Sequence, residues 1–245
     1  MGRIISILNQ KGGVGKTTST YNLATCLAKL NYKVLMIDLD PQGSLTLMTG
    51  NDPMAFDNTI MDIFERKNIN DCINNLPINN LSFIPCNIKL SKFERTILRT
   101  SFLKSAISKI GFDYDYIFID CPPSLGMLTL NALTASDYII APVETTPLSV
   151  FALDDLMDTV NELQDTDNPN LKFAGVIATK YASNTKLDNE MLNDLKRKYN
   201  VLGIIKNSVD AKKGIEDGLP CVEISPNSSI AKSYKEISEN LINII

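Results

Sequence analysis

Residues 10–18 read Gln10-Lys11-Gly12-Gly13-Val14-Gly15-Lys16-Thr17-Thr18 and follow a short apolar run, residues 3–8. The apolar run predicts a β-strand, and leucines at helical spacing predict a helix over residues 16–30. Glycines without a Cβ let successive backbone N–H groups turn toward an anion, and the first turn of the following helix adds unpaired donors. A glycine-rich turn without a ligand is the alternative, but average residue frequencies make this string a rare coincidence. The strand, turn and helix therefore predict a phosphate-binding loop.

The side chains of this loop carry the chemistry of nucleotide binding. Lys16 can bring a positive charge to the β- and γ-phosphates, and the Thr17 hydroxyl can bind a magnesium ion. We therefore expect ATP and Mg²⁺ as cofactors. The loop residues expected to contact the nucleotide are Lys11, Gly12, Gly13, Val14, Gly15, Lys16, Thr17 and Thr18.

Apolar strand-like runs alternate with amphipathic helical stretches along nearly the whole chain. The expected strands are residues 3–8, 33–38, 81–85, 115–120, 137–142, 173–179 and 201–205. The expected helices are residues 16–30, 91–109, 124–135, 148–164, 186–199 and 229–244. This alternation predicts an α/β fold, a mostly parallel twisted sheet covered by helices on both faces. Residues 50–80, rich in Asn and Asp, fit an excursion between strands, so we expect a single domain over residues 1–245.

Aspartates stand at the ends of two of these predicted strands. Asp38 and Asp40 follow the strand at 33–38, and Asp120 closes the strand at 115–120. In α/β folds, ligands bind at the carboxyl ends of the strands. Asp120 can contact magnesium there through a water, because that ion keeps part of its hydration shell. The other two aspartates could instead cap a helix or form a turn. Proximity to the phosphate loop favours function for Asp40, and both interpretations stay open for Asp38.

The composition excludes several kinds of chemistry. Histidine is absent, which removes histidine acid/base catalysis and most transition-metal sites. The five cysteines form no C-x-x-C pair, so a disulfide framework or a zinc site is not expected. No apolar stretch approaches the roughly 18 to 20 residues that span a bilayer, and we expect no targeting segment before the first strand. We expect a cytoplasmic protein.

The loop departs from the ordinary G-x-x-x-x-G-K-[ST] form, since Gln10 replaces the first glycine and Lys11 adds a second cation. In this it resembles the deviant Walker A ATPases, which include ParA, MinD and the nitrogenase iron protein. The stretch at residues 38–43 is similar to switch I of the small ParA proteins, and the stretch at residues 120–126 is similar to their switch II. The resemblance covers nearly the whole chain and implies the fold already predicted.

The resemblance also implies roles for single residues. In that family the early lysine, here Lys11, reaches across a nucleotide-sandwich homodimer, where it can stabilise charge that develops in the transition state. Asp40 would position or activate the attacking water. Three stretches are candidates for the adenine contact, residues 142–144, 179–180 and 205–207, and the resemblance places Asn207 where the family contacts adenine. The implied catalytic residues are Lys11, Lys16 and Asp40, and the implied metal-binding residues are Thr17, Asp38 and Asp120.

Family members bind DNA non-specifically as ATP-bound dimers, and a ParB-like centromere-binding adaptor stimulates their slow ATPase. Residues 172–213 of this chain contain nine Lys/Arg and four Asp/Glu, although a solvated helix surface would give the same excess. The resemblance thus implies a nucleoid-associated partitioning ATPase, without an N-terminal helix-turn-helix domain. The lysines expected to contact DNA are Lys180, Lys186, Lys206, Lys212 and Lys213.

Three alternatives remain open at this point. A MinD-like membrane-cycling ATPase would need a basic amphipathic tail, whereas the predicted last helix mixes Lys and Glu and ends apolar. A nitrogenase-type electron donor would need two cluster-ligating cysteines in each subunit, and Cys121 alone stands in a suitable place. A related ATPase could position a protein cargo instead of DNA.

Overall fold

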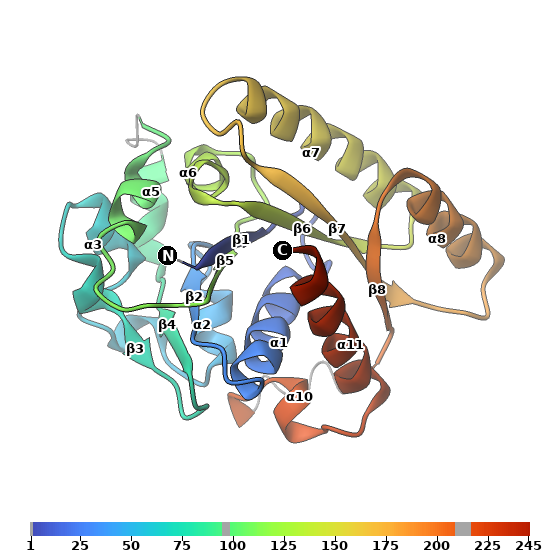
Figure 1. Cartoon of the computed structure of the whole chain (residues 1–245), viewed down its shortest axis with the longest axis horizontal. Helices are drawn as coiled ribbons and strands as arrows, with labels where there is room; N and C mark the ends of the chain where they lie inside the picture. Colours follow the sequence, from blue (N-terminus) through green and yellow to red (C-terminus); the bar gives the residue numbers. More distant parts are fainter. Residues whose placement is uncertain (1, 95–98, 209–216) are drawn as a thin grey trace.

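The computed structural model describes residues 2–94, 99–208 and 217–245, and its centre is an eight-stranded sheet (Figure 1). The strand order is β3-β4-β2-β5-β1-β6-β7-β8, and every neighbouring pair is parallel except β3 with β4. The strands are β1 (Arg3–Ile7), β2 (Val34–Asp38), β3 (Asn74–Asn75), β4 (Leu81–Ile84), β5 (Tyr116–Asp120), β6 (Tyr138–Glu144), β7 (Lys172–Tyr181) and β8 (Val201–Lys206). The seven predicted strands are confirmed, and β3 is an addition within the excursion at residues 50–80.

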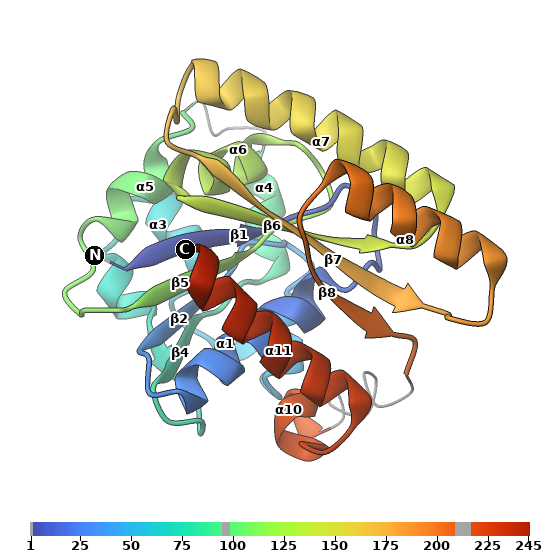
Figure 2. The same ribbon diagram turned by 45° about the vertical axis from the view of Figure 1, so that its right-hand side comes forward.

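Helices cover both faces of the sheet, as the turned view shows (Figure 2). One face carries α6 (Met127–Ala135), α7 (Pro147–Asp165) and α8 (Lys186–Lys198). The other carries α1 (Lys16–Lys29), α10 (Cys221–Ile224) and α11 (Ser229–Ile244). Shorter helices are α2 (Ser44–Met48), α3 (Ile60–Phe64), α4 (Ser91–Glu94), α5 (Phe102–Ile107), η1 (Pro53–Ala55), η2 (Ile69–Cys72) and η3 (Ile88–Leu90). The predicted α/β fold class is confirmed.

Each face of the sheet has its own apolar core. On the α1 side, Tyr21 and Tyr234 are fully covered together with the alternate strand residues Ile5, Met36 and Phe118. On the opposite side the core contains the intervening strand residues, such as Ile37 and Ile119, and the inner residues of α6 and α7. Strands that are apolar on both faces belong in the middle of a parallel sheet, where helices cover both sides.

The single helix predicted over residues 91–109 is wrong. The described residues form two helices there, α4 and α5, because a side chain from α6 satisfies the backbone at the break. Asn131 donates from Nδ2 to the carbonyl of Arg99 (2.9 Å) and accepts from the amide of Leu103 (3.2 Å), so α5 starts afresh at Phe102.

The helix predicted from residue 124 begins later, at Met127. Gly126 is extended (φ −83, ψ −173), and the carbonyl of Ser124 accepts a hydrogen bond from the Thr129 hydroxyl at 2.6 Å. The backbone before Met127 therefore leaves the helical path. Across the described residues, no helix combines the length and the apolar character that crossing a membrane requires.

Candidate nucleotide site

The phosphate-binding loop lies between β1 and α1, at the edge of the sheet where the parallel strands end. Gly13 and Gly15 have φ values of +75 and +94, which side-chain-bearing residues rarely adopt. A Cβ built on Gly12 would meet nothing within 4 Å, so the loop faces open space. No side chain of the described residues caps the start of α1, which leaves its first N–H groups available to an anion. This geometry fits a bound phosphate chain.

Lys16 is buried beneath the loop and turns its ammonium group toward it. Nζ of Lys16 donates to the carbonyl of Lys11 at 3.3 Å. Burial lowers the pKa of Lys16, and the charges of Asp120 and Asp40 oppose that shift in part. A polyanion at the loop would favour the charged lysine, as expected for a phosphate-binding residue.

Thr17 and Asp120 meet directly, although 103 residues separate them in the chain. The Thr17 hydroxyl donates to Oδ2 of Asp120 at 2.7 Å, and the Thr20 hydroxyl donates to Oδ1 at 3.3 Å. Asp120 is fully buried, and burial, reinforced by the charge of Asp38, raises its pKa to about 8. A divalent cation beside these oxygens would favour the ionised carboxylate.

Asp38 lies next to Asp120, because the two are paired in the β2–β5 register. Its Oδ2 accepts from both the amide (2.8 Å) and the hydroxyl (2.7 Å) of Thr46, at the start of α2. Burial raises the pKa of Asp38 to about 7, and the hydrogen bonds from Thr46 oppose the shift. Asp38 therefore ties switch I to the sheet, with its other oxygen 3.3 Å from the amide of Asp40.

Asp40 is half-buried at the mouth of the site. Its Oδ1 accepts from the amide of Gln42 at 2.9 Å, and its carbonyl accepts from the amide of Gly43. Burial raises the pKa of Asp40, and the nearby charge of Lys16 lowers it in part. The turn-forming interpretation is supported, since the carboxylate of Asp40 shapes the loop, and its charge interaction with Lys16 places it near the phosphate loop.

In the described residues, no three His, Cys, Asp or Glu side chains are grouped so as to hold a metal ion by themselves. Magnesium can bind at a site with fewer than three protein ligands, because it keeps several waters and takes further oxygens from substrate phosphates. Thr17 and Asp120, with Asp38 behind them, are the residues that would hold it. The structure therefore places the sequence-predicted metal residues side by side.

The side chain of Lys11 is folded back onto its own chain. Nζ of Lys11 lies 2.5 Å from Oε2 of Glu144, the last residue of β6, and donates to the hydroxyls of Ser149 (3.1 Å) and Thr146 (3.4 Å). The other carboxylate oxygen of Glu144 lies 2.5 Å from Nζ of Lys180. No catalytic or metal role was predicted for Glu144 from the sequence. Its position at the end of a strand, like that of Asp38 and Asp120, was the available signal.

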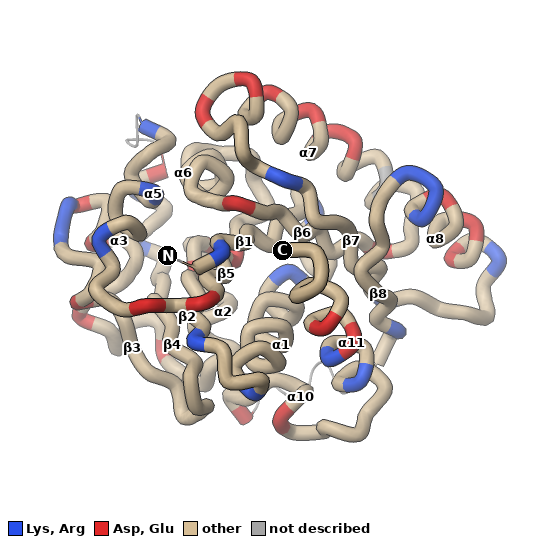
Figure 3. Tube along the Cα trace, viewed as in Figure 1, with Lys and Arg blue, Asp and Glu red and all other residues tan. Residues whose placement is uncertain are grey.

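The other predicted contacts lie farther along the same edge or outside the described residues. Asn207 is exposed after β8, and its backbone N–H donates to the carbonyl of Tyr181. Lys206 is exposed at the end of β8, and Lys186 is 91% exposed at the start of α8, where it pairs with Glu190. The predicted DNA contacts Lys212 and Lys213 lie outside the described residues. Figure 3 shows basic and acidic residues interspersed along α8, with a basic last turn.

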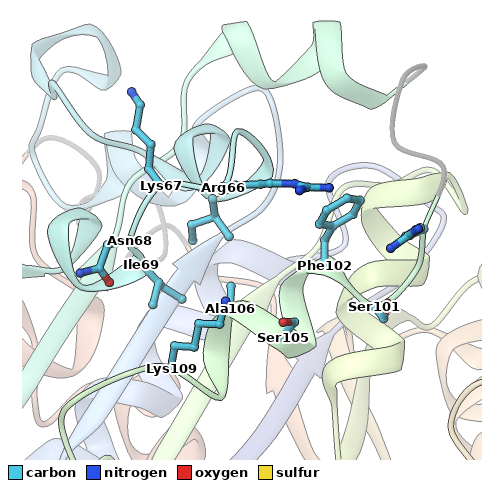
Figure 4. A pocket seen from close by; sticks show the side chains of 11 residues that line it. Arg66, Lys67, Asn68, Ile69, Ser101, Phe102, Ser105, Ala106 and Lys109 are labelled. Atoms are coloured by element: carbon cyan, nitrogen blue, oxygen red, sulfur yellow. The ribbon is translucent and has the colours of Figure 1, made fainter.

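A surface pocket of ≈ 570 Å³ lies elsewhere, between the turn after α3 and helix α5 (Figure 4). Arg66 extends toward Phe102 on its wall, and Lys109 approaches from the opposite side. Among the described residues, no Asp or Glu lines this pocket, and no lining residue comes from the phosphate loop or the acidic strand ends. It is separate from the nucleotide site.

Comparisons with known proteins agree with this geometry. A family model described as an AAA domain matches residues 2–173. The sporulation initiation inhibitor protein Soj of Bacillus subtilis is 36% identical, over 98% of each chain. A putative plasmid partition protein of Borrelia burgdorferi, solved with AMPPNP, is 33% identical over 100% of each chain, with a TM-score of 0.88. Cobyrinic acid a,c-diamide synthase of Mycobacterium smegmatis, solved with ADP and magnesium, is 30% identical over 99% of this chain and 95% of that one, with a TM-score of 0.86. The chain belongs to the ParA/Soj family of deviant Walker A ATPases.

Proposed function

We propose that this protein is an ATP-dependent DNA-partitioning ATPase that works as a sandwich dimer. In the ATP-bound state two subunits close on two nucleotides and bind DNA non-specifically. Slow hydrolysis, stimulated by a ParB-like adaptor, then releases the DNA. The observation that carries the proposal is the phosphate loop with two lysines, one buried beneath it and one at its mouth, beside the Thr17–Asp120 pair.

Each residue has a task in this proposal. Bound Mg²⁺ would neutralise phosphate charge and polarise the bond that breaks. The loop amides and Lys16 bind and orient the phosphates, while Thr17 and Asp120 hold the metal shell. Asp40 lies where it can orient a water, and its raised pKa makes it a better proton acceptor than an exposed aspartate. Lys11 would supply a second positive charge, in addition to Lys16, to the phosphates of the partner subunit's nucleotide.

The structure gives less support to a membrane-cycling ATPase. The apolar stripe of α11, which includes Ile230, Tyr234, Ile237 and Leu241, is buried against the sheet and α1. Those side chains are therefore engaged in the core and face no bilayer. Sedimentation with anionic liposomes and ATP distinguishes the two functions, and binding to liposomes but not to DNA would favour the membrane alternative.

The proposal is tested by measuring DNA retention with ATP and with ADP for the native protein, Lys11→Ala and Asp40→Ala. We expect retention with ATP alone, loss of retention in Lys11→Ala, and lasting retention without turnover in Asp40→Ala. Two matched controls, Lys33→Ala just before β2 and Asp57→Ala on the exposed excursion, should behave like the native protein. Equal retention with ADP and ATP would contradict the proposed switch.

A further inference from the structure

Glu144 stands between two lysines at the mouth of the phosphate loop. Its side chain is 13% exposed, and its two oxygens lie 2.5 Å from Nζ of Lys11 and 2.5 Å from Nζ of Lys180. Burial raises the pKa of Glu144, but the hydrogen bonds from the two lysines lower it more, so it is a carboxylate. The single negative charge of Glu144 is thus paired with two positive charges, those of Lys11 and Lys180.

Lys180 is held in this place by its backbone. It has a φ of +52, an unusual value for a residue with a side chain, at a point where the pairing of β7 with β8 is irregular. The neighbouring Thr179 hydroxyl donates to the carbonyl of Val14 in the phosphate loop at 2.8 Å. Nζ of Lys180 lies 4.0 Å from the position that a Cβ on Gly13 would take. Lys180 therefore belongs to the loop's surroundings.

We propose that Glu144 is a positioning residue that holds Lys11 within its own subunit, and that Lys180, by sharing this carboxylate, eases the departure of Lys11 toward the partner subunit's triphosphate. The inference rests on the proposed function, in which Lys11 acts across the dimer.

The sharing matters because Glu144 is mostly buried. When Lys11 leaves, a lone carboxylate in this place would lose its counter-ion, and stranding a partly buried charge is costly. Lys180 remains and keeps the carboxylate paired, so the departure costs less. The two substitutions that disturb this arrangement therefore act in opposite directions. Removal of the Glu144 charge frees Lys11, whereas removal of Lys180 leaves Glu144 paired with Lys11 alone.

The test measures the dissociation constant of the dimer formed with a non-hydrolysable ATP analogue and Mg²⁺, by light scattering over a concentration series. We expect Glu144→Gln to lower this constant by about tenfold, since it removes the charge from a charge-assisted hydrogen bond. Lys180→Met should raise the dissociation constant by about tenfold, because Glu144 then has Lys11 as its single charged partner and holds it more tightly. The double variant should match Glu144→Gln, because Lys180 acts through Glu144. Nucleotide affinity of each monomer is measured in parallel, so that a change in dimerisation is separated from a change in nucleotide binding, because Lys180 lies close to the phosphate loop.

Unchanged or weaker dimerisation in Glu144→Gln would overturn the inference, as would a Lys180→Met effect that persists in the double variant. If Glu144→Gln lowers the thermal midpoint, Ser149→Ala replaces it, because that variant removes another acceptor of Lys11 and keeps the carboxylate. Ser149→Ala should lower the dissociation constant of the dimer, as Glu144→Gln does. An unchanged dissociation constant would contradict the inference. Failure of the proposed function looks different, since the native protein itself would then show no dimer with the analogue.

Discussion

The Thr17 hydroxyl donates a 2.7 Å hydrogen bond to Asp120 and thereby joins the first turn of α1 to the end of β5. Thr20, one turn further along α1, holds the other oxygen of the same carboxylate. Both hydroxyls lie on the side of α1 that faces the sheet. Asp120 is thus fixed in orientation by the helix that begins at the phosphate loop, so the proposed metal site and the phosphate loop are tied to the same helix.

Binding of magnesium with nucleotide should release protons near neutral pH. Burial raises the pKa of Asp120 to about 8, so this group holds part of its proton at pH 7.5, whereas a magnesium site needs the carboxylate. The release should therefore be measurable at pH 7.5 and should fade at pH 9, where the proton has already gone. Calorimetry in two buffers of different ionisation enthalpy gives the number of protons released.

The matched variant for this measurement is Asp120→Asn, which keeps the shape but cannot release a proton. It should bind magnesium more weakly and show a smaller release at pH 7.5. A release that is the same at both pH values in the native protein would show that Asp120 already carries its charge at pH 7.5.

Thr46 should stabilise the protein through Asp38. Its hydroxyl donates to Oδ2 of that fully buried carboxyl group at 2.7 Å and accepts from the amide of Cys86 at 3.0 Å. Thr46→Val keeps the shape but leaves two buried polar groups without this partner, so the free energy of unfolding should fall by about 1–3 kcal/mol. Urea unfolding without magnesium measures the change.

Thr46→Ser is the control, because it retains the hydroxyl and removes one methyl group. Its free energy of unfolding should be clearly closer to the native value than that of Thr46→Val. Equal losses in the two variants would mean that the methyl group and its packing, rather than the hydrogen bonds, account for the effect of Thr46.

The phosphate loop and the acidic strand ends could be predicted because their chemistry is local in sequence. Three glycines before Lys16, together with a carboxylate at the end of a strand, rarely occur in a chain that binds no phosphate. The contact between Lys11 and Glu144 could not be predicted in the same way. Glu144 lies 133 residues away, and it meets Lys11 because β6 is paired with β1 in the sheet. A register between distant strands is not visible in a local pattern.

The break within residues 91–109 was missed for a related reason. Helical spacing of apolar residues continues through this region, so a local pattern favours one long helix. The break depends on Asn131, a side chain from α6 that serves the carbonyl of Arg99 and the amide of Leu103. Tertiary hydrogen bonds of this kind override local propensity, and they can be recognised after the packing is known.

The salt dependence of DNA binding tests the sequence-based prediction that Lys186 and Lys206 contact phosphates. Both side chains are exposed near the carboxyl end of the sheet, and Lys186 has one weak ion pair on its own helix. Loss of one phosphate contact should lower the slope of log K against log salt concentration by about 0.9. Lys186→Ala and Lys206→Ala should each weaken ATP-dependent DNA retention and lower the slope by about 0.9, with little change in the free energy of unfolding because each side chain is exposed.

Lys104→Ala, which replaces an exposed lysine on α5, is the control and should leave the slope unchanged. A slope that stays the same in both test variants would place the DNA interface on other residues.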